Sequence, residues 1–384
     1  MMRMDSLAPL SMHRPAWISL LVAFLFFVGG ILLIGPLLGF LALLPYLEMN
    51  PATIETQLND MLLNPSNHPE ARTGILLLQG LNSVGAFIVA PLLYLIVADK
   101  VRPGVFFTSY NLKAGAVLLC VALTFFFMQV NGVFIEWNAG LTLPEGLAPV
   151  EAWMKNTEET AAKMTAFLTD FTDLGYLMLA ILVLAVIPAI GEELLFRGIF
   201  QNLLSKQYGN IHIGIWASAF IFSAIHLQFY GFVPRLLLGA LFGYLYMWSG
   251  SLVYAMIGHF INNFLTLVTL YLVQIGVIEI DFSATELLPI GSILISVVLA
   301  VAATIFFRKQ FSMKGDKESW DVVFRSPEEY RARMVGNILE EKGLKPVVVN
   351  KKESAYGVTG EYEISVNRNE AGQALQIIQN DIKF

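Results

Sequence analysis

Residues 174–204 read LGYLMLAILVLAVIPAIGEELLFRGIFQNLL. Apart from Glu192, Glu193 and Arg197, the stretch has no charged residue, and it is longer than the roughly 20 residues that a helix needs to cross a bilayer. Ionisable side chains deep in a membrane are costly and usually face a protein interior. The stretch therefore predicts a membrane helix that carries functional groups.

The composition of the whole chain also indicates a membrane protein. Of its 384 residues, 56% are hydrophobic and 14% are charged, whereas a soluble domain has about 25% charged residues. Charges are sparse up to Phe307 and dense afterwards, so two environments are expected. Eight apolar runs predict membrane spans, of which the fifth and sixth are short: Trp17–Leu44, Thr73–Ala98, Ala114–Phe134, Leu174–Leu204, Ile213–Gln228, Pro234–Trp248, Leu252–Ile275 and Leu287–Phe307.

These runs predict an all-α polytopic membrane helix bundle of about eight transmembrane helices in residues 1–312. Lysines and arginines gather at alternate ends of the spans, for example Lys100, Lys206 and Arg308, while the loops between them are acidic. Positively charged ends stay in the cytoplasm. An even number of spans with both termini cytoplasmic satisfies this bias.

Two segments are predicted to lie outside the membrane. In the loop before the fourth span, Val150–Leu168 has helical spacing and is either a helix on the membrane surface or an ordinary exposed helix. Residues 313–384 have a βαββα pattern, which predicts a small cytoplasmic α+β domain. Within it, Ser326-Pro327-Glu328-Glu329 predicts a helix start, with Ser326 as the cap and Glu329 completing a capping box.

The ionisable groups inside the spans are concentrated in one region. Besides the fourth span, the fifth carries His226 and the seventh carries His259. Glu192 and His226 each lie about 14 residues from the turn at 206–212, on opposite sides of it, which is ~21 Å at 1.5 Å per residue. The two groups are therefore expected at matching depths on antiparallel helices.

Helical spacing separates the two glutamates. Glu193 and Arg197 are four residues apart and can pair. Glu192 and Arg197 are five apart and diverge by about 140°, so Glu192 is the freer carboxylate. Pro188 removes a backbone hydrogen bond one turn earlier, and Gly191 permits another chain to approach closely.

The seventh span offers a second pair of polar groups. His259 and Asn263 are four residues apart and point the same way, whereas Asn262 is expected to face elsewhere. A carboxylate beside a neutral imidazole can activate water by general base catalysis. A second imidazole and an amide can donate hydrogen bonds to an oxyanion. This set suits peptide hydrolysis.

Three motifs resemble those of the CAAX prenyl protease type II and bacteriocin-processing family of intramembrane proteases. They are Glu192-Glu193-Leu-Leu-Phe-Arg197, Phe222-Ser-Ala-Ile-His226 and His259-Phe-Ile-Asn-Asn263. The resemblance covers about residues 174–270. It implies an intramembrane endopeptidase in which Glu192 and His226 activate water while His259 and Asn263 hold the oxyanion. We expect Glu193 and Arg197 to be supporting residues, and Phe222 to pack near the histidine.

Several alternatives stay open. The family that these motifs resemble is described both as metal-dependent and as glutamate-dependent. We prefer a mechanism without a cofactor. The alternative is a zinc ion held by Glu192, His226 and His259. The rival functions are a non-proteolytic immunity or scaffold protein and a proton-coupled transporter. The expected partners are the lipid bilayer and a membrane-embedded peptide or protein substrate, which need not be prenylated, and we expect no nucleic acid. The expected location is the plasma (inner) membrane of a prokaryote.

The tail has a resemblance of its own. Val347–Val366 is similar to a small domain assigned to prokaryotic signal transduction, above all at Asn350, Ser354-Ala355-Tyr356-Gly357 and Gly360-Glu361. The resemblance implies a regulatory partner for this domain and supplies no chemistry.

Overall fold

The computed structural model describes residues 10, 14–48, 50, 52–106, 112–279, 289–311, 320–350, 361–367 and 370–382. The chain divides into two compact units, Met1–Phe311 and Ser312–Phe384. Residues Ser354–Gly360, which carry part of the tail resemblance, lie outside the described residues.

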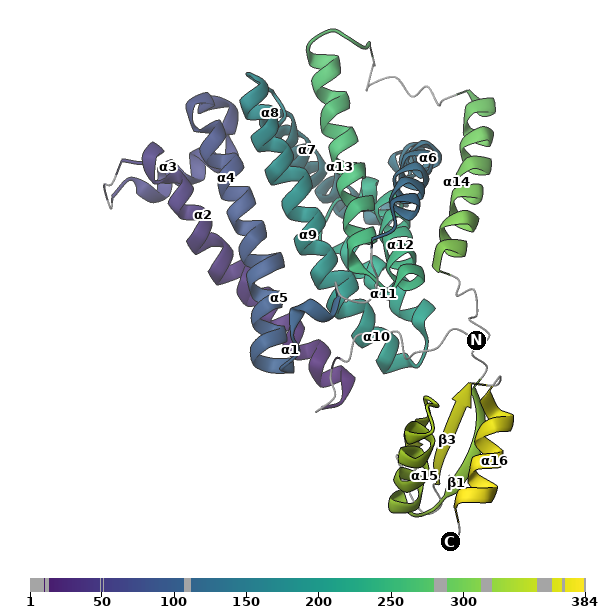
Figure 1. The fold of residues 1–384 in the computed structure, drawn as a ribbon. Coiled ribbons are helices and arrows are strands. Elements are labelled where there is room, and N and C mark those ends of the chain that lie inside the picture. Colours follow the sequence, from purple (N-terminus) through teal and green to yellow (C-terminus); the bar gives the residue numbers. More distant parts are fainter. Residues whose placement is uncertain are drawn as a thin grey trace. The chain divides into compact units, whose positions relative to one another are not determined.

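The first unit is a bundle of membrane helices (Figure 1). Within the described residues, seven helical segments are long and apolar enough to span a bilayer: Ala16–Tyr46, Pro69–Asp99, Ala114–Ala139, Leu174–Tyr208, Phe229–Ser249, Leu252–Gln274 and Ile290–Phe311. The chain is an integral membrane protein, and the predicted fold class is confirmed. The predicted fifth span is a shorter helix, α11 (Ile211–Ala224), which does not reach spanning length.

The first two spans and the outer helices are divided as follows: α1 (Ala16–Gly29), α2 (Gly35–Leu43), α3 (Ile54–Leu63), α4 (Arg72–Ser83), α5 (Ala90–Leu93), α6 (Ala114–Ala139) and α7 (Ala148–Leu168). The rest of the bundle consists of α8 (Leu174–Ile181), α9 (Ile187–Glu193), α10 (Gln201–Tyr208), α11, α12 (Phe232–Ser249), α13 (Leu252–Gln274) and α14 (Ile290–Phe311). Short π-helical segments join α1 to α2, α4 to α5, α8 to α9 and α9 to α10.

Pairs of helices pack closely in the bundle: α14 against α6, α12 against both α11 and α13, and α2 against α4 (Figure 1). Small residues permit the closest approaches, as is usual between membrane helices. A Cβ atom added at Gly85 would lie 2.6 Å from the Cα atom of Gly35. Large apolar side chains such as Leu33 and Leu37 point away from the bundle, where lipid is expected.

The second unit is a small α+β domain. Its antiparallel sheet has the strand order β1-β3-β2 and is packed with two helices. The elements are β1 (Trp320–Ser326), α15 (Glu329–Glu341), β2 (Val347–Asn350), β3 (Tyr362–Asn367) and α16 (Ala371–Asp381). The core includes Val335, Leu339 and Ile364.

The helix start in this unit differs from the prediction. Ser326 is the last residue of β1, and its Oγ atom accepts a hydrogen bond from the backbone N–H of Glu328 at 3.1 Å. The N-cap of α15 is Glu328, which makes no side-chain cap hydrogen bond. The predicted capping box is therefore wrong, because the strand extends through the serine and the helix begins two residues later than a Ser326 cap requires.

Candidate active site

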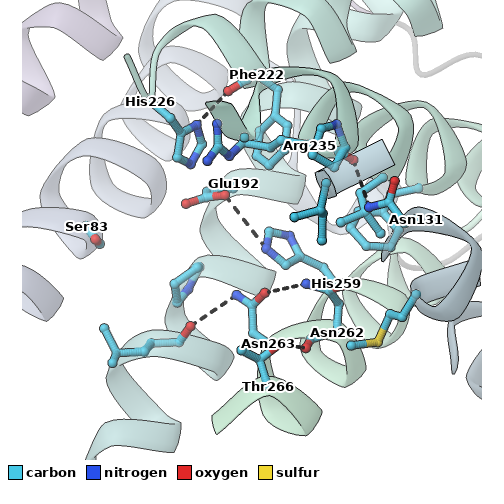
Figure 2. A pocket seen from close by; sticks show the side chains of 18 of the residues that line it. Ser83, Asn131, Glu192, Phe222, His226, Arg235, His259, Asn262, Asn263 and Thr266 are labelled. Atoms are coloured by element: carbon cyan, nitrogen blue, oxygen red, sulfur yellow. Dashed lines mark hydrogen bonds and ion pairs between the residues drawn. The ribbon is translucent and has the colours of Figure 1, made fainter. Parts of the chain in front are cut away.

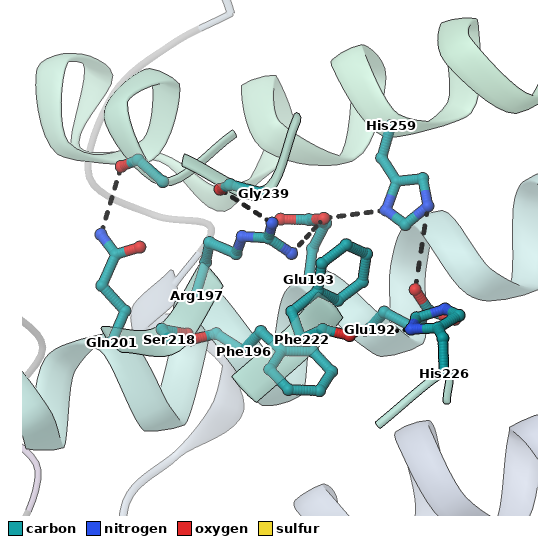
Figure 3. Close-up of polar contacts among 11 residues, drawn as sticks. Glu192, Glu193, Phe196, Arg197, Gln201, Ser218, Phe222, His226, Gly239 and His259 are labelled. Atoms are coloured by element: carbon teal, nitrogen blue, oxygen red, sulfur yellow. Dashed lines mark hydrogen bonds and ion pairs between the residues drawn. The ribbon is translucent and has the colours of Figure 1, made fainter. Parts of the chain in front are cut away.

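A buried network of charges connects α9 to α13. The Arg197 Nη1 atom donates to Glu193 Oε1 at 2.7 Å, so the ion pair predicted from four-residue spacing is present (Figure 3). Arg197 also donates to the Gly239 carbonyl at 2.9 Å. The same Glu193 oxygen lies 2.8 Å from His259 Nδ1. Glu193 therefore bridges an arginine and a histidine, a contact that spacing along one helix could not reveal.

Glu192 points away from this pair. Its side chain is 12% exposed, and its Oε2 atom lies 3.8 Å from His259 Nε2. The two nitrogens of His259 thus face two different glutamates. Gly191 explains how α9 lies so close to the second span: a Cβ atom there would lie 2.8 Å from Phe87 Cβ. This close approach was predicted.

His226 is not on a helix, contrary to the prediction. Helix α11 ends at Ala224, and the ring Nδ1 atom of His226 donates to the Phe222 carbonyl at 2.8 Å. In a continuing α-helix that carbonyl would accept the backbone N–H of residue 226, which here bonds to the Ser223 carbonyl at 3.4 Å. A carbonyl only accepts, so Nδ1 carries the hydrogen. In the neutral ring, Nε2 is left as an acceptor.

Asn263 bonds to a backbone carbonyl of the fourth span near Pro188. Pro188 has no N–H to donate to the Leu184 carbonyl four residues earlier, and Asn263 Nδ2 donates to that carbonyl at 3.1 Å. Asn262 Nδ2 donates to Asn263 Oδ1 at 3.0 Å. The expectation that Asn262 faces elsewhere is wrong, since both asparagines line the same cavity.

These groups meet in one cavity of about 520 Å³, which we call the central cavity. Its lining includes Glu192, His226, His259 and Asn263, so all four candidate catalytic residues contact the same space (Figure 2). Figures 2 and 3 both place His226 beside the Glu192 carboxylate. Glu193 and Arg197 do not line the cavity but are buried behind it.

Aromatic rings fix the positions of the polar groups. Phe222 lies edge-on to His226 with ring centroids 5.1 Å apart, and the Arg197 guanidinium lies 4.8 Å from its ring centroid. Phe242 stacks on His259 at 5.3 Å with an interplanar angle of 15°. Phe222 thus packs against the histidine, as expected, and also covers the arginine.

Several polar residues of the cavity were not predicted from the sequence, and three of them are described here. Arg235, at the start of α12, lines it and donates to Gln228 Oε1 at 2.8 Å. Asn131 of α6 is 3% exposed, and its Nδ2 atom donates to the Pro234 carbonyl. Gln79 of α4 also faces the cavity. For Asn131 and Gln79, the sequence signal that could have indicated a site residue was an amide side chain within an otherwise apolar run.

The candidate zinc ligands do not form a metal site. Within the described residues, no three His, Cys, Asp or Glu side chains are placed to hold one metal ion. Both Nδ1 atoms of the two histidines already have partners, at Phe222 and Glu193. The Nε2 atoms of both histidines and the Glu192 carboxylate remain as donors, and we derive no step through a metal.

Comparison with known proteins identifies the middle of the bundle. Residues 174–265 match the family described as Type II CAAX prenyl endopeptidase Rce1-like. This stretch of the chain is similar to members of that family. The match contains every candidate site residue from Glu192 to Asn263. It supports a CAAX-type intramembrane protease fold.

A relative and the solved structures add less. The uncharacterized protein YpbD of Bacillus subtilis (strain 168) is 34% identical over 85 residues, which cover 21% of this chain. The matched part spans 40% of the length of that relative. No solved structure matches the chain.

Proposed function

We propose that the protein is an intramembrane endopeptidase that hydrolyses peptide bonds of membrane-associated substrates. The observation that supports this most strongly is the meeting of Glu192, His226, His259 and Asn263 in one cavity inside a membrane bundle. The Rce1-like match over the same residues also supports it.

Glu192 and His226 activate the water. Glu192 accepts one proton of the water, and His226 Nε2 accepts a hydrogen bond from the other O–H, since Nδ1 is held as a donor by the Phe222 carbonyl. The water oxygen attacks the peptide carbonyl carbon, and the carbonyl oxygen becomes an oxyanion. The proton on Glu192 then passes to the amide nitrogen as the carbon–nitrogen bond breaks, which yields a carboxylic acid and an amine and returns Glu192 to its carboxylate form.

His259 and Asn263 stabilise the oxyanion in different ways. His259 Nδ1 donates to Glu193, so the ring offers a second donor at Nε2 only as the imidazolium. The carboxylates of Glu192 and Glu193 lie on its two sides. Asn263 bonds to the Leu184 carbonyl with one of its two N–H groups. Its second N–H group is free to bind the oxyanion.

Two rival functions keep the same residues. A non-proteolytic immunity or scaffold member would bind a peptide without cleaving it. A proton-coupled transporter would use Glu192 and His226 as a proton relay. Neither would introduce an oxygen atom from water into a peptide.

The deciding experiment uses purified full-length protein in detergent, a library of membrane-derived peptides and water enriched in ¹⁸O. Hydrolysis places one ¹⁸O atom in each new carboxyl terminus, which mass spectrometry detects. Glu192→Gln keeps the shape but loses the base, so we expect turnover to fall by about 10²–10⁴-fold. Glu145→Gln, at an exposed residue shortly before α7, is the matched control. Undiminished cleavage by Glu192→Gln would remove Glu192 from the mechanism.

A further inference from the structure

Helix α7 belongs neither to the Rce1-like match nor to the predicted spans. Its half-buried residues, among them Met154, Ala161 and Met164, recur at helical spacing, and the buried Leu168 ends the helix. Ala162 and the ion pair of Glu159 with Lys163 lie on the exposed side. One face of α7 therefore contacts the bundle, and the helix is not simply exposed.

The C-terminal end of α7 is firmly attached. The Tyr176 hydroxyl donates to the Leu168 carbonyl at 3.1 Å. Arg72, from the second span, pairs with Asp170 at 2.6 Å and lies 5.0 Å from the ring centroid of Phe167. These contacts hold the inner face of α7 as a fixed wall.

A second pocket, also of about 520 Å³, lies between this wall and α13. We call it the α7 pocket. Ala161, Met164 and Leu168 line it from α7, and it shares His226 and Asn263 with the central cavity. The two spaces are therefore contiguous at the candidate catalytic residues.

The lining of the α7 pocket combines apolar and amide groups. Its α7 side offers a methyl group, a flexible thioether and a leucine, which accommodate apolar side chains of varied shape. Opposite them lie the amides of Gln79 and Asn262, which both donate and accept hydrogen bonds. An extended peptide at membrane depth must find partners for each backbone N–H and C=O group, and these amides can supply them.

We propose that the α7 pocket binds an extended apolar stretch of the substrate beside the scissile bond, with Ala161 and Met164 contacting its side chains and Gln79 hydrogen-bonding to its backbone. That the bound peptide is a substrate rests on the proposed hydrolysis. That the pocket binds a peptide does not rest on it. The pocket lies toward the end of the bundle where α6 ends and α8 begins, away from Lys206. With the predicted orientation, the peptide enters from the side opposite the cytoplasm.

The test measures peptide binding apart from turnover. The probe is a fluorescein-labelled decapeptide of leucine, alanine and serine residues, added to full-length Glu192→Gln protein in detergent, with fluorescence anisotropy as the readout. Ala161→Phe fills the pocket, and we expect it to weaken binding at least ten-fold. Ala162→Phe, the adjacent alanine on the exposed face, should leave the affinity within two-fold.

A second pair of variants covers the case in which Ala161→Phe does not fold. Gln79→Leu removes the amide from the pocket, whereas Gln129→Leu removes a half-buried amide of α6 that lines neither cavity. Only the first should weaken binding. Equal affinities within both pairs, or no binding of the probe to any of the proteins, would overturn the proposal. Binding that depends on Ala161 in a wild-type protein that cleaves nothing would support the pocket and refute the hydrolase.

Discussion

Two helices of this chain carry the same ion pair in opposite surroundings. Glu193–Arg197 in the membrane unit and Glu329–Arg333 in the tail unit have the same spacing and the same N–O distance of 2.7 Å. The side chains of the first pair are 0% and 1% exposed, whereas those of the second are 49% and 71% exposed. The spacing fixes the geometry of the pair, and burial decides what the pair contributes.

In the membrane unit, both side chains are almost completely buried, so bulk water does not replace a lost partner. Glu193 also accepts from His259, so the pair connects the arginine to the candidate site. In the tail unit, Glu329 also accepts from the Tyr362 hydroxyl at 3.1 Å, but water reaches these groups. Removing one partner therefore leaves a buried charge in one case and a solvated one in the other.

The largest expected effect is that of Arg197→Ala. It leaves Glu193 buried without its cation, which should lower the free energy of unfolding by about 3–5 kcal/mol and reduce activity with it. The matched variant Arg333→Ala should cost only about 0.2–0.5 kcal/mol. Unfolding of both purified proteins in mixed detergent micelles measures the difference. An Arg197→Ala protein as stable as the Arg333→Ala protein would break the comparison, and inactivity without instability would point to a direct catalytic role.

Removing both charges sharpens the comparison. In the double variant Glu193→Leu with Arg197→Met, no buried ion is left unpaired, so at least about 1 kcal/mol of the stability lost in Arg197→Ala should return. Activity should stay low, because His259 Nδ1 then lacks the acceptor that orients it. Unfolding and peptide cleavage are measured on the same preparation. Recovery of both quantities would show that Glu193 serves the arginine alone.

Deleting the tail unit should have a smaller effect. Ser312–Phe384 is a compact unit with its own core, and it contains none of the candidate site residues. A chain that ends at Gly315 should cleave a small peptide within a few-fold of the full-length rate, and the tail would then serve regulation or partner binding. A truncated protein that is stable but inactive would mean that the tail helps to build the site.

Chelation should have the smallest effect. His259 and Arg197 account for the pairing of the buried carboxylates without a metal. A chelator should therefore leave the cleavage rate unchanged, and elemental analysis should find zinc far below one equivalent. Zinc at one equivalent, lost and regained together with activity, would contradict this expectation and give Glu192 a ligand role.

The sequence predicted the parts of the site that depend on spacing within one helix. The Glu193–Arg197 pair follows from a four-residue interval. The site groups on other elements were expected only to lie at matching depths. Contacts between helices, such as Glu193 with His259, leave no periodic signal in either segment.

Competition for backbone hydrogen bonds explains the other differences. Helix α11 was predicted to continue through His226, but the imidazole takes the Phe222 carbonyl and the helix ends at Ala224. The capping box failed at Ser326 because β1 includes that serine. In both cases the local sequence pattern was overridden, by a side-chain hydrogen bond in the first and by strand pairing in the second. Neither can be read from the periodicity of the sequence. The fold class needed only hydropathy and the βαββα order, and was therefore predictable.

The break at Pro188 has an evolutionary consequence. Asn263 is held by the Leu184 carbonyl, which has no donor at residue 188. A substitution that restored an N–H group there would give the span another backbone donor, and in a regular α-helix that donor would compete with Asn263 for its anchor. Selection for a more stable helix and selection for a fixed amide are therefore opposed at this position, which is a trade-off between stability and activity. A backbone carbonyl beside the proline of one span thus holds the Asn263 side chain of another.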